Sequence, residues 1–350
     1  MIIRVGASSS AGLTALGAVG AVGINIESVA AEPPPETTRL RLVRTKALCF
    51  APLYLAEDLL SGEGFAEVRH VATEGRTADA LASDRADLGM DFIGPLAMRV
   101  DAGDPVLILA GGHVGCHEVF GTDRIRSLSD LRGRSIAVPA LGSGQHVFLA
   151  SMLMYVGLDP RRDVTWVSQP ASAARHLLAE GTIDAIPTFP PDNHEFRARR
   201  IGRVVVNTAT DPTWSGYFCC MLAGNREFVR HHPVATKRAL RAILKSADLC
   251  ALEPDRVTRL MVDRGFAQNH DDTLQTVREL NYHKWRELNP EDTIRFYALR
   301  LHDAGMIKST TAEDHRPGHR LALLQRAEDG AKRIDGSWLG ATSKPSRRSA

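Results

Sequence analysis

Residues 126–167 read RSLSDLRGRSIAVPALGSGQHVFLASMLMYVGLDPRRDVTWV, and this stretch predicts a strand, a helix and a second strand in succession. The short apolar run Ser135–Pro139 has the composition of a buried strand and leads into a turn of glycine and serine. An amphipathic helix is predicted from near Gln145, and the second strand follows at Val164–Val167. Two strands joined by a crossover helix run parallel, so the stretch predicts a mostly parallel sheet.

The glycine and serine turn, Leu141–Gly144, indicates a ligand site. Such a turn leaves free backbone N–H groups at a helix N-terminus, which suits an anionic or polar group of a ligand. We expect Ser143 to contact the ligand, although a serine here also has the ordinary role of capping the helix. The turn does not match G-x-G-x-x-G, so a dinucleotide site is not expected.

Strands and helices alternate on both sides of this stretch. The predicted strands are 39–43, 68–71, 86–92, 106–111, 135–139, 164–167, 183–187 and 203–206. The predicted helices upstream are 53–61, 77–83 and 96–102, with a loop over 45–52. This order is typical of α/β proteins, in which helices cover both faces of an open parallel sheet.

A late apolar strand, residues 217–223 (YFCCMLA), indicates that the chain returns to its first sheet. The following residues have helical patterning, including a helix over 234–251. We therefore expect two α/β lobes with a ligand cleft between them, at the C-terminal ends of the strands. Lobe 1 is predicted from residues 39–123 and 217–308 and lobe 2 from 127–210, with crossings near 121–126 and 211–216.

Composition limits the function. The chain has 350 residues, 44% of them hydrophobic and 24% charged, which suits a globular protein of two ordinary domains. Its formal net charge of +2 gives no electrostatic basis for binding nucleic acid. The body of the chain contains no apolar run long enough to span a membrane.

Both ends of the sequence differ from its body. Residues 11–26 are uncharged and apolar after the single basic residue Arg4, and the small residues 29–31 precede a proline-rich start. This pattern predicts a signal peptide over residues 1–31. Residues 309–350 are rich in Arg, His, Ser and Lys, which predicts a disordered tail.

The cysteines do not follow a known spacing. They are Cys49, Cys116, Cys219, Cys220 and Cys250, and an odd number does not make a disulfide framework. No C-x-x-C pair is present, so the usual spacing of zinc and redox sites is missing and no metal is predicted. We expect Cys116 and Cys250 to be small buried hydrophobic residues.

Several segments, in this order and at this spacing, resemble one family. They are APLYLAEDLLSGEGF (51–65), LASDRADLGMDFIGPL (81–96), SLSDLRGRSIAV (127–138), GSGQHVFLASMLMYVGLDPRRDVTWV (142–167), EGTIDAI (180–186) and NREFVRHHPVATKRALRAILKSADLCALEPDRV (225–257). Together they span residues 39–308 and resemble the solute-binding proteins of ABC importers, in the branch for sulfonates, taurine, nitrate and thiamine-pyrimidine precursors. The resemblance implies the type II periplasmic-binding-protein fold and an exported, periplasmic protein.

The candidate ligand site consists of side chains at the predicted strand ends and in the second crossing. They are Cys49, Phe50, Asp91, Phe92, His113, Ser143, Gln145, His146, Phe189, Trp214 and Phe218. A partly aromatic cleft with a few polar groups is typical of sites for small molecules. The resemblance implies that the head group of the ligand lies at the Ser143 turn.

Four of these residues also have an ordinary structural role open to them. Asp91 either pairs with an amine of the ligand or caps the helix that includes Leu96. His146 either faces the site or lies on the exposed side of its helix. Trp214 and Phe218 either stack on the ligand or belong to the core.

The resemblance implies a binding protein without catalytic residues, cofactor or metal. It would capture a small anionic or zwitterionic solute as a monomer and deliver it to an ABC permease in the inner membrane.

The alternative is an enzyme on the same fold. A thiamine-pyrimidine synthase uses a pyridoxal-linked lysine and a substrate histidine, and Asp91 and Pro95 stand at those positions here. The amine that forms the Schiff base is therefore missing, and the activity of this enzyme is not expected. Its cysteine-rich strand is represented only in part, by Cys219 and Cys220. An aryl-sulfinate desulfinase uses a cysteine nucleophile whose place Cys49 would take, with Lys46 or His113 to activate it.

If residues 1–31 are a signal peptide, the mature protein begins at Glu32. N-terminal sequencing of protein recovered from the periplasm is expected to read Glu-Pro-Pro-Pro. A sequence that begins at Met1 contradicts the prediction.

Overall fold

The computed structural model describes residues 32–73 and 76–309. The predicted signal peptide and the predicted tail, apart from Ser309, lie outside the described residues. The chain divides into a unit of residues 1–33 and a unit of residues 34–350. Within the described residues, all helices and strands belong to the second unit.

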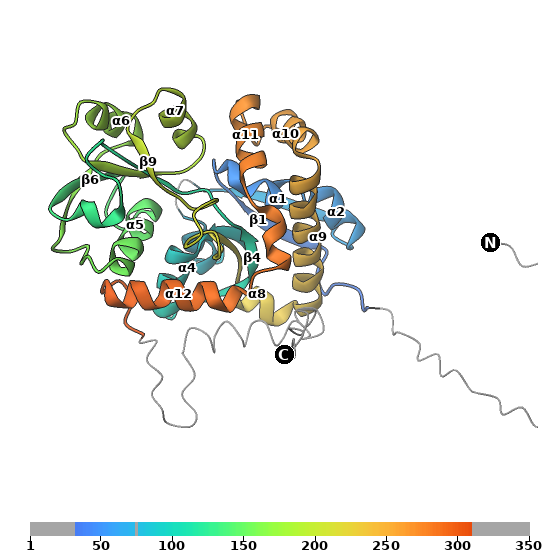
Figure 1. The fold of residues 1–350 in the computed structure, drawn as a ribbon. Coiled ribbons are helices and arrows are strands. Elements are labelled where there is room, and N and C mark those ends of the chain that lie inside the picture. The colour runs from blue at the N-terminus through green and yellow to red at the C-terminus, as the bar shows by residue number, and fades with distance from the viewer. Residues whose placement is uncertain (1–31, 74–75, 310–350) are drawn as a thin grey trace, which may run out of the picture. The chain divides into compact units, whose positions relative to one another are not determined.

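Two five-stranded sheets form the framework of this unit (Figure 1). The strand order is β2-β1-β3-β10-β4 in the first sheet and β7-β6-β8-β5-β9 in the second. The first sheet consists of β1 Arg39–Arg44, β2 Glu67–Ala72, β3 Leu88–Phe92, β4 Val106–His113 and β10 Cys220–Asn225. The second consists of β5 Glu118–Gly121, β6 Arg134–Val138, β7 Val164–Ser168, β8 Ala185–Thr188 and β9 Arg203–Asn207.

Each sheet contains one strand that runs against the others. β10 is antiparallel to β3 and β4, and β5 is antiparallel to β8 and β9. The pairs β1–β2, β1–β3, β6–β7 and β6–β8 are parallel. The predicted α/β class with mostly parallel sheets is therefore confirmed.

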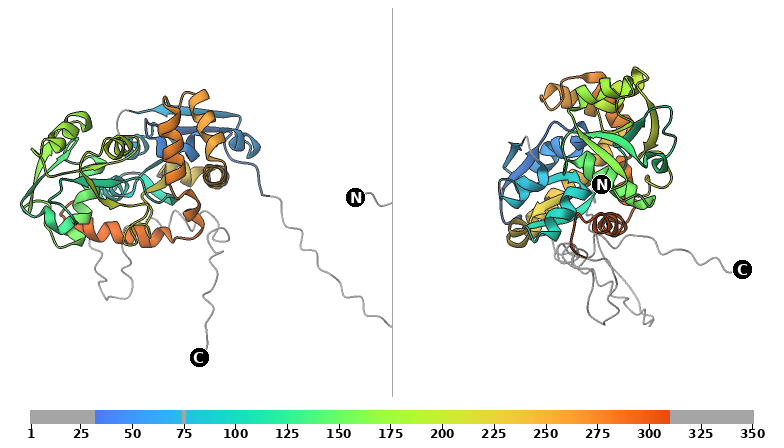
Figure 2. Two further views of the ribbon diagram at one scale, coloured as in Figure 1. Left: turned by 45° about the horizontal axis from the view of Figure 1, so that its top comes forward. Right: turned by 90° about the vertical axis from the view of Figure 1, so that its left-hand side faces the viewer.

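Helices surround both sheets (Figures 1 and 2). Those that follow strands of the first sheet are α1 Ala51–Tyr54, α2 Glu57–Gly62, α3 Thr77–Ala82, α4 Ile93–Asp101, α8 Arg226–His231, α9 Pro233–Leu252, α10 Pro254–Asp263, α11 His270–Glu279 and α12 Pro290–Asp303. Those of the second sheet are α5 Gly144–Tyr155, α6 Ala171–Ala179 and α7 Asp192–Ala198. Three short 3-10 helices are η1 Leu48–Phe50, η2 Leu128–Leu131 and η3 Tyr282–Arg286. In the part of the chain that the structure describes, no helix is long and apolar enough to cross a membrane.

α12, the last helix of the residues that the structure describes, joins the helices of the two sheets. α12 packs against α4, which belongs to the first sheet, and against α5, which belongs to the second. Figure 1 shows α12 running past both of these helices. α4 and α5 also contact each other directly, and a Cβ added to Gly94 would lie only 2.6 Å from Cγ1 of Val147.

The structure corrects two predicted helices and a predicted loop. The helix predicted over 53–61 is two helices, α1 and α2, and the loop predicted over 45–52 contains η1 and the start of α1. Pro52 belongs to the first turn of α1, where the missing N–H is not needed. α4 begins at Ile93 rather than Leu96, because Pro95 is likewise accommodated in a first turn.

The structure also moves the first crossing between the sheets. Residues 118–121 form β5 of the second sheet, so the chain leaves the first sheet after β4 and before Glu118, rather than at 121–126. All four residues of β5 are buried, and a short, fully buried strand lacks the alternation that would reveal it. β10 belongs to the first sheet, as expected for the late apolar strand, but it begins at Cys220 rather than at residue 217. In that sheet it lies between β3 and β4.

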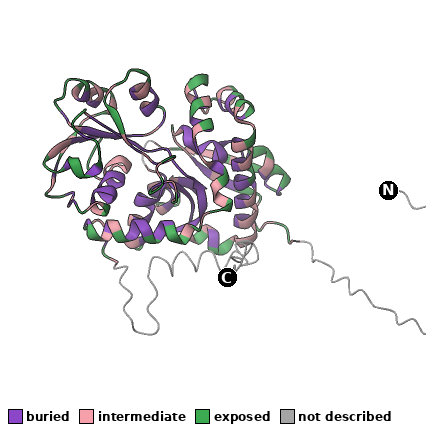
Figure 3. Ribbon diagram, viewed as in Figure 1, coloured by how far each residue is buried: buried purple, intermediate pink, exposed green. Residues whose placement is uncertain are grey.

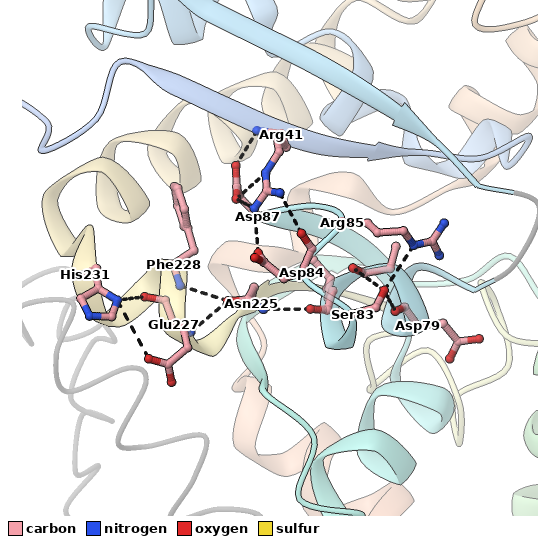
Figure 4. Close-up of polar contacts among 12 residues, drawn as sticks. Arg41, Asp79, Ser83, Asp84, Arg85, Asp87, Asn225, Glu227, Phe228 and His231 are labelled. Carbon is pink, nitrogen blue, oxygen red and sulfur yellow. Dashed lines mark hydrogen bonds and ion pairs between the residues drawn. The ribbon is translucent and has the colours of Figure 1, made fainter.

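A polar network stabilises one end of the first sheet, where the parallel strand β3 begins and the antiparallel strand β10 ends (Figure 4). The Arg41 guanidinium donates to both Asp84 and Asp87, and the backbone N–H of Arg41 donates to Asp87 Oδ2 at 2.6 Å. Asn225 caps α8 by accepting from Glu227 N at 2.9 Å, and its amide donates to Leu81 O at 2.9 Å. The network therefore ties β1, the start of β3 and the end of β10 together.

Close packing in the first sheet depends on a glycine in β4. Most residues of both sheets are buried (Figure 3). The ring of Phe218, which is fully buried, lies where the side chain of residue 111 would be. A Cβ at Gly111 would be 2.2 Å from Cζ of Phe218.

Gly111→Ala is therefore expected to lower the free energy of unfolding by about 1–3 kcal/mol, as overpacking of a core usually does. Urea denaturation measures this change. Gly62→Ala is the control, because a Cβ at the end of α2 meets no atom within 4 Å. A Gly111→Ala protein as stable as the Gly62→Ala protein contradicts the prediction.

Candidate functional site

The predicted site residues of the first sheet meet around the start of β10. Because β10 is antiparallel, its first residue lies at the C-terminal ends of β3 and β4. Cys220 is paired with Phe92 on one side and with His113 on the other. The structure thus brings two predicted residues, Phe92 and His113, to a cysteine that sequence patterns did not place in the site.

An aromatic group lies where segments of the two sheets meet. The His117 ring stacks on Phe148 of α5 with centroids 4.3 Å apart, and lies 5.1 Å from the Phe92 ring and 5.9 Å from the Phe189 ring. Tyr297 of α12 contacts Phe92 from the other side, with centroids 5.3 Å apart. Burial lowers the pKa of His117 to about 4, so its ring is neutral at pH 7.

Two of these five rings, Phe92 and Phe189, were predicted from their places after strands. His117, Phe148 and Tyr297 were not predicted, because from sequence alone each is equally well explained as a core residue of its own segment.

Ser143 is the N-cap of α5. Its Oγ accepts from the backbone N–H of His146 at 3.3 Å, and His146 Nδ1 in turn accepts from the N–H of Gly142 at 3.1 Å. Burial lowers the pKa of His146, so the ring stays neutral and keeps this acceptor. Within the described part of the chain, the N–H groups of Gly144 and Gln145 have no hydrogen-bond partner. The turn therefore keeps two free donors at the positive end of a helix.

An arginine beside the first sheet hydrogen-bonds to this turn of the second sheet's helix α5. Arg76, the N-cap residue of α3, donates from NH1 to the carbonyl oxygen of Gly142 at 3.0 Å. Its Nε lies 3.5 Å from Asp79 Oδ2. The contact places a cation beside the free donors of α5. No local sequence pattern distinguishes Arg76 from a surface arginine.

Asp91 caps a helix, but not the predicted one. Its carboxylate accepts from the N–H of Ala78 at 3.0 Å and from the N–H of Phe92 at 2.8 Å. It therefore caps α3 and not the helix that contains Leu96. Burial raises the pKa of Asp91 to about 6, although these two hydrogen bonds lower it.

Four of the five cysteines gather beside the aromatic group. Cys49, His113, Cys116 and Cys220 are buried, and each offers a ligand atom within 4.8 Å of the others. Hydrogen bonds from Cys116 and Cys220 lower the pKa of the Cys49 thiol well below its usual value, and the neighbouring His113 lowers it further. Burial raises the pKa of Cys116, Cys219 and Cys220. Cys116 is buried in the core, as predicted, and it also belongs to this cluster.

Three predicted residues lie in packed core. Phe50 is buried in η1. Trp214 packs edge-on against Tyr155 at 5.0 Å, and Phe218 is the ring beside Gly111. Of the alternatives open for Trp214 and Phe218, the packing favours the core role.

A cluster of charges connects α7 of the second sheet to α11 of the first. Arg197 donates to Glu279 at 2.6 Å and lies 3.0 Å from Glu118. The buried His194 ring lies 3.6 Å from Glu279 and 3.8 Å from Asp272. Burial raises the pKa of Glu279, but the contacts with His194 and Arg197 outweigh it and hold the pKa at about 2.

Comparisons with known proteins place this fold among relatives. The model of the NMT1-like family matches residues 34–262. No curated protein matches the sequence of the chain.

Solved structures share the fold at low sequence identity. The periplasmic nitrate-binding protein from Synechocystis PCC 6803 is 14% identical, with a TM-score of 0.66 over 90% of this chain and 94% of that one. The alkanesulfonate-binding protein from Xanthomonas axonopodis pv. citri, bound to MOPS, is 18% identical, with a TM-score of 0.60 over 85% and 99%. A Candida albicans protein with the generic periplasmic-binding-protein fold is 12% identical, with a TM-score of 0.62 over 84% and 96%. These likenesses confirm the predicted fold.

The ion pairs of Glu279 predict a pH dependence of stability. Because its pKa falls from the ordinary 4.5 to about 2 on folding, its contribution is complete above pH 4.5 and is lost as the pH falls toward 2. The difference in Tm between the wild type and Glu279→Gln should therefore shrink over this window. A difference that stays constant from pH 6 to pH 2.5 contradicts the prediction.

Proposed function

The chain belongs to the NMT1-like family, and we propose that it is the solute-binding component of an ABC importer. In this proposal the two lobes close on a small anionic or zwitterionic solute and present it to a permease in the inner membrane. The protein acts in the periplasm, as a monomer, and catalyses no reaction. Because β5 belongs to the second sheet, we propose residues 39–117 with 217–308 for lobe 1 and residues 118–210 for lobe 2.

The observation that carries the proposal is the pairing of Arg76 with the Ser143 turn. The turn offers the free N–H groups of Gly144 and Gln145 at a helix N-terminus. Arg76, which precedes α3 of the first half, hydrogen-bonds the same turn at Gly142. An anion bound here would hold both halves through charge-assisted hydrogen bonds, so that binding favours the closed arrangement.

The surroundings of the turn suit a solute with an apolar part. The His146 ring meets Trp166 edge-on at 4.6 Å, beside the turn. The aromatic group of Phe92, His117, Phe148, Phe189 and Tyr297 also includes a residue of α5, because Phe148 belongs to that helix. A sulfonate, nitrate, a pyrimidine precursor or an aromatic acid would each supply the anionic or polar group that the turn requires. Two structural relatives of this fold are described as binding nitrate and an alkanesulfonate.

The enzyme alternative depends on Cys49. Its lowered pKa is a property of nucleophilic cysteines. However, the residue is only 4% exposed, and its sulfur lies among the side chains of Cys116, Cys220 and His113. A nucleophile must reach its substrate, so this burial favours the binding protein. Release of sulfite from an aryl-sulfinate by the wild type, and not by Cys49→Ser, would replace our proposal with the desulfinase.

Thermal-shift measurements on the chain from residue 32 test the proposal. The solutes are alkanesulfonates, taurine, nitrate, pyrimidine precursors and aromatic acids. A ligand at 100 times its Kd adds about 2.7 kcal/mol to the free energy of unfolding, which raises Tm by several degrees. No shift with any anionic or zwitterionic solute would refute the proposal.

Arg76→Ala is expected to weaken binding of the solute found in that screen by about tenfold or more. The reason is the loss of one charge-assisted hydrogen bond, worth about 1.5–3 kcal/mol. Isothermal titration calorimetry measures the Kd. Arg69→Ala is the matched control, because Arg69 lies on β2 with 74% of its side chain exposed. Equal affinities of the two variants would show that Arg76 does not hold the solute.

A further inference from the structure

The cysteine and histidine cluster next to the proposed ligand site is assembled from distant parts of the chain. Cys49 lies in η1 after β1, His113 ends β4, Cys116 lies in the following loop, and Cys220 begins β10. These residues are 4%, 0%, 6% and 3% exposed. Each offers one ligand atom, and the four atoms lie within 4.8 Å of one another. Three sulfurs and one nitrogen therefore converge on one buried point.

His113 is oriented like a metal ligand. Its Nδ1 lies 3.1 Å from the carbonyl oxygen of Gly115, an acceptor, so Nδ1 carries the proton and Nε2 keeps a lone pair. Nε2 is buried and, among the described residues, has no hydrogen-bond partner. An unsatisfied buried nitrogen is costly, and metal-binding histidines usually donate their second N–H to a carbonyl in this way.

The loop that carries Cys116 is held in an unfavourable conformation. Cys116 has φ of 134°, which side chains other than glycine rarely adopt, and Gly115 has φ of 80°. Gly115 cannot be replaced easily, because a Cβ there would lie 2.6 Å from the Cβ of Ala209. Hydrogen bonds between Val114 and Asn281 hold the loop from the other side. This conformation keeps the Cys116 sulfur at the cluster.

We propose that Cys49, His113, Cys116 and Cys220 bind one Zn²⁺ ion in a closed, four-coordinate structural site. Three thiolates and one imidazole are a common zinc set, and sulfurs at about 2.3 Å from a tetrahedral zinc lie about 3.8 Å apart. The ligand atoms, which lie within 4.8 Å of one another, therefore need to move only slightly to coordinate one zinc ion. Binding releases to solvent the protons of those thiols that are still protonated, and three thiolates with one Zn²⁺ give the site one net negative charge.

Cys219 and His117 lie in the shell around this site. Cys219 Sγ is 3.0 Å from Cys116 Sγ and 3.1 Å from His117 Nδ1. With Cys116 they form a second group of possible ligands, but it has only three members and shares Cys116 with the first. The set of four is the one that completes a tetrahedron. The site does not depend on the proposed transport function, since it would join η1, β4 and β10 of this chain whatever solute the chain binds.

The test uses the chain from residue 32, purified with all thiols reduced. We expect metal analysis after expression to give one zinc per chain. The zinc-free protein should bind one equivalent of Co²⁺, with the intense visible bands and thiolate charge-transfer band of tetrahedral coordination. Reduced wild type that binds less than a tenth of an equivalent overturns the proposal, including the case in which Cys116 pairs with Cys219 in a disulfide. Copper or iron in place of zinc overturns the choice of ion.

Variants identify the ligands. Cys220→Ser and His113→Ala should each lose the tetrahedral Co²⁺ spectrum. Cys250→Ser should keep it, because Cys250 is equally buried but lies in α9, outside the cluster. If the variants of the cluster do not fold, alkylation of the wild type decides. Zinc should then protect Cys49, Cys116 and Cys220 from iodoacetamide in urea at concentrations that open the zinc-free protein. Equal labelling with and without zinc, or loss of the spectrum in Cys250→Ser alone, overturns the proposal.

Discussion

The insertion of β10 between β3 and β4 is the constraint on which the rest of the structure depends. Its antiparallel hydrogen bonds reverse the chain relative to its neighbours, so the start of β10 meets the ends of β3 and β4. Those ends carry Phe92 and His113, and the start of β10 carries Cys220. Both the aromatic group and the cysteine cluster are built around this meeting. A parallel strand in the same place would have put Cys219 and Cys220 at the opposite end of the sheet, near the network of Arg41 and Asp87.

Local patterns predict what is determined locally. The βαβ stretch, its glycine and serine turn and the cap at Ser143 depend on neighbouring residues, and the structure contains all of them. β5 was missed because its four residues are all buried and follow no alternation. The role of Asp91 was misassigned because its hydrogen-bond partner, Ala78, is supplied by tertiary packing of α3 on β3.

The cysteine cluster was beyond sequence reasoning for a different reason. Zinc sites that can be recognised in a sequence place two ligands in one turn, so that spacing reveals them. Here the four members come from four segments separated by up to 171 positions, from Cys49 to Cys220. Only a fold that brings the ends of β1 and β4 to the start of β10 joins them. The same is true of Arg76, whose partner Gly142 belongs to the other half of the unit.

β4 lies at the edge of its sheet, and β10 is its neighbour there. All eight residues of β4 are buried in the folded chain. Its partner β10 begins more than a hundred residues after β4 ends, so during synthesis β4 leaves the ribosome long before β10 does. An apolar strand that waits so long is open to pairing with other chains, and contacts of high sequence separation form slowly. The fold thus favours late, concerted completion of the first sheet, and a chaperone that covers β4 until β10 arrives would raise the yield of native protein.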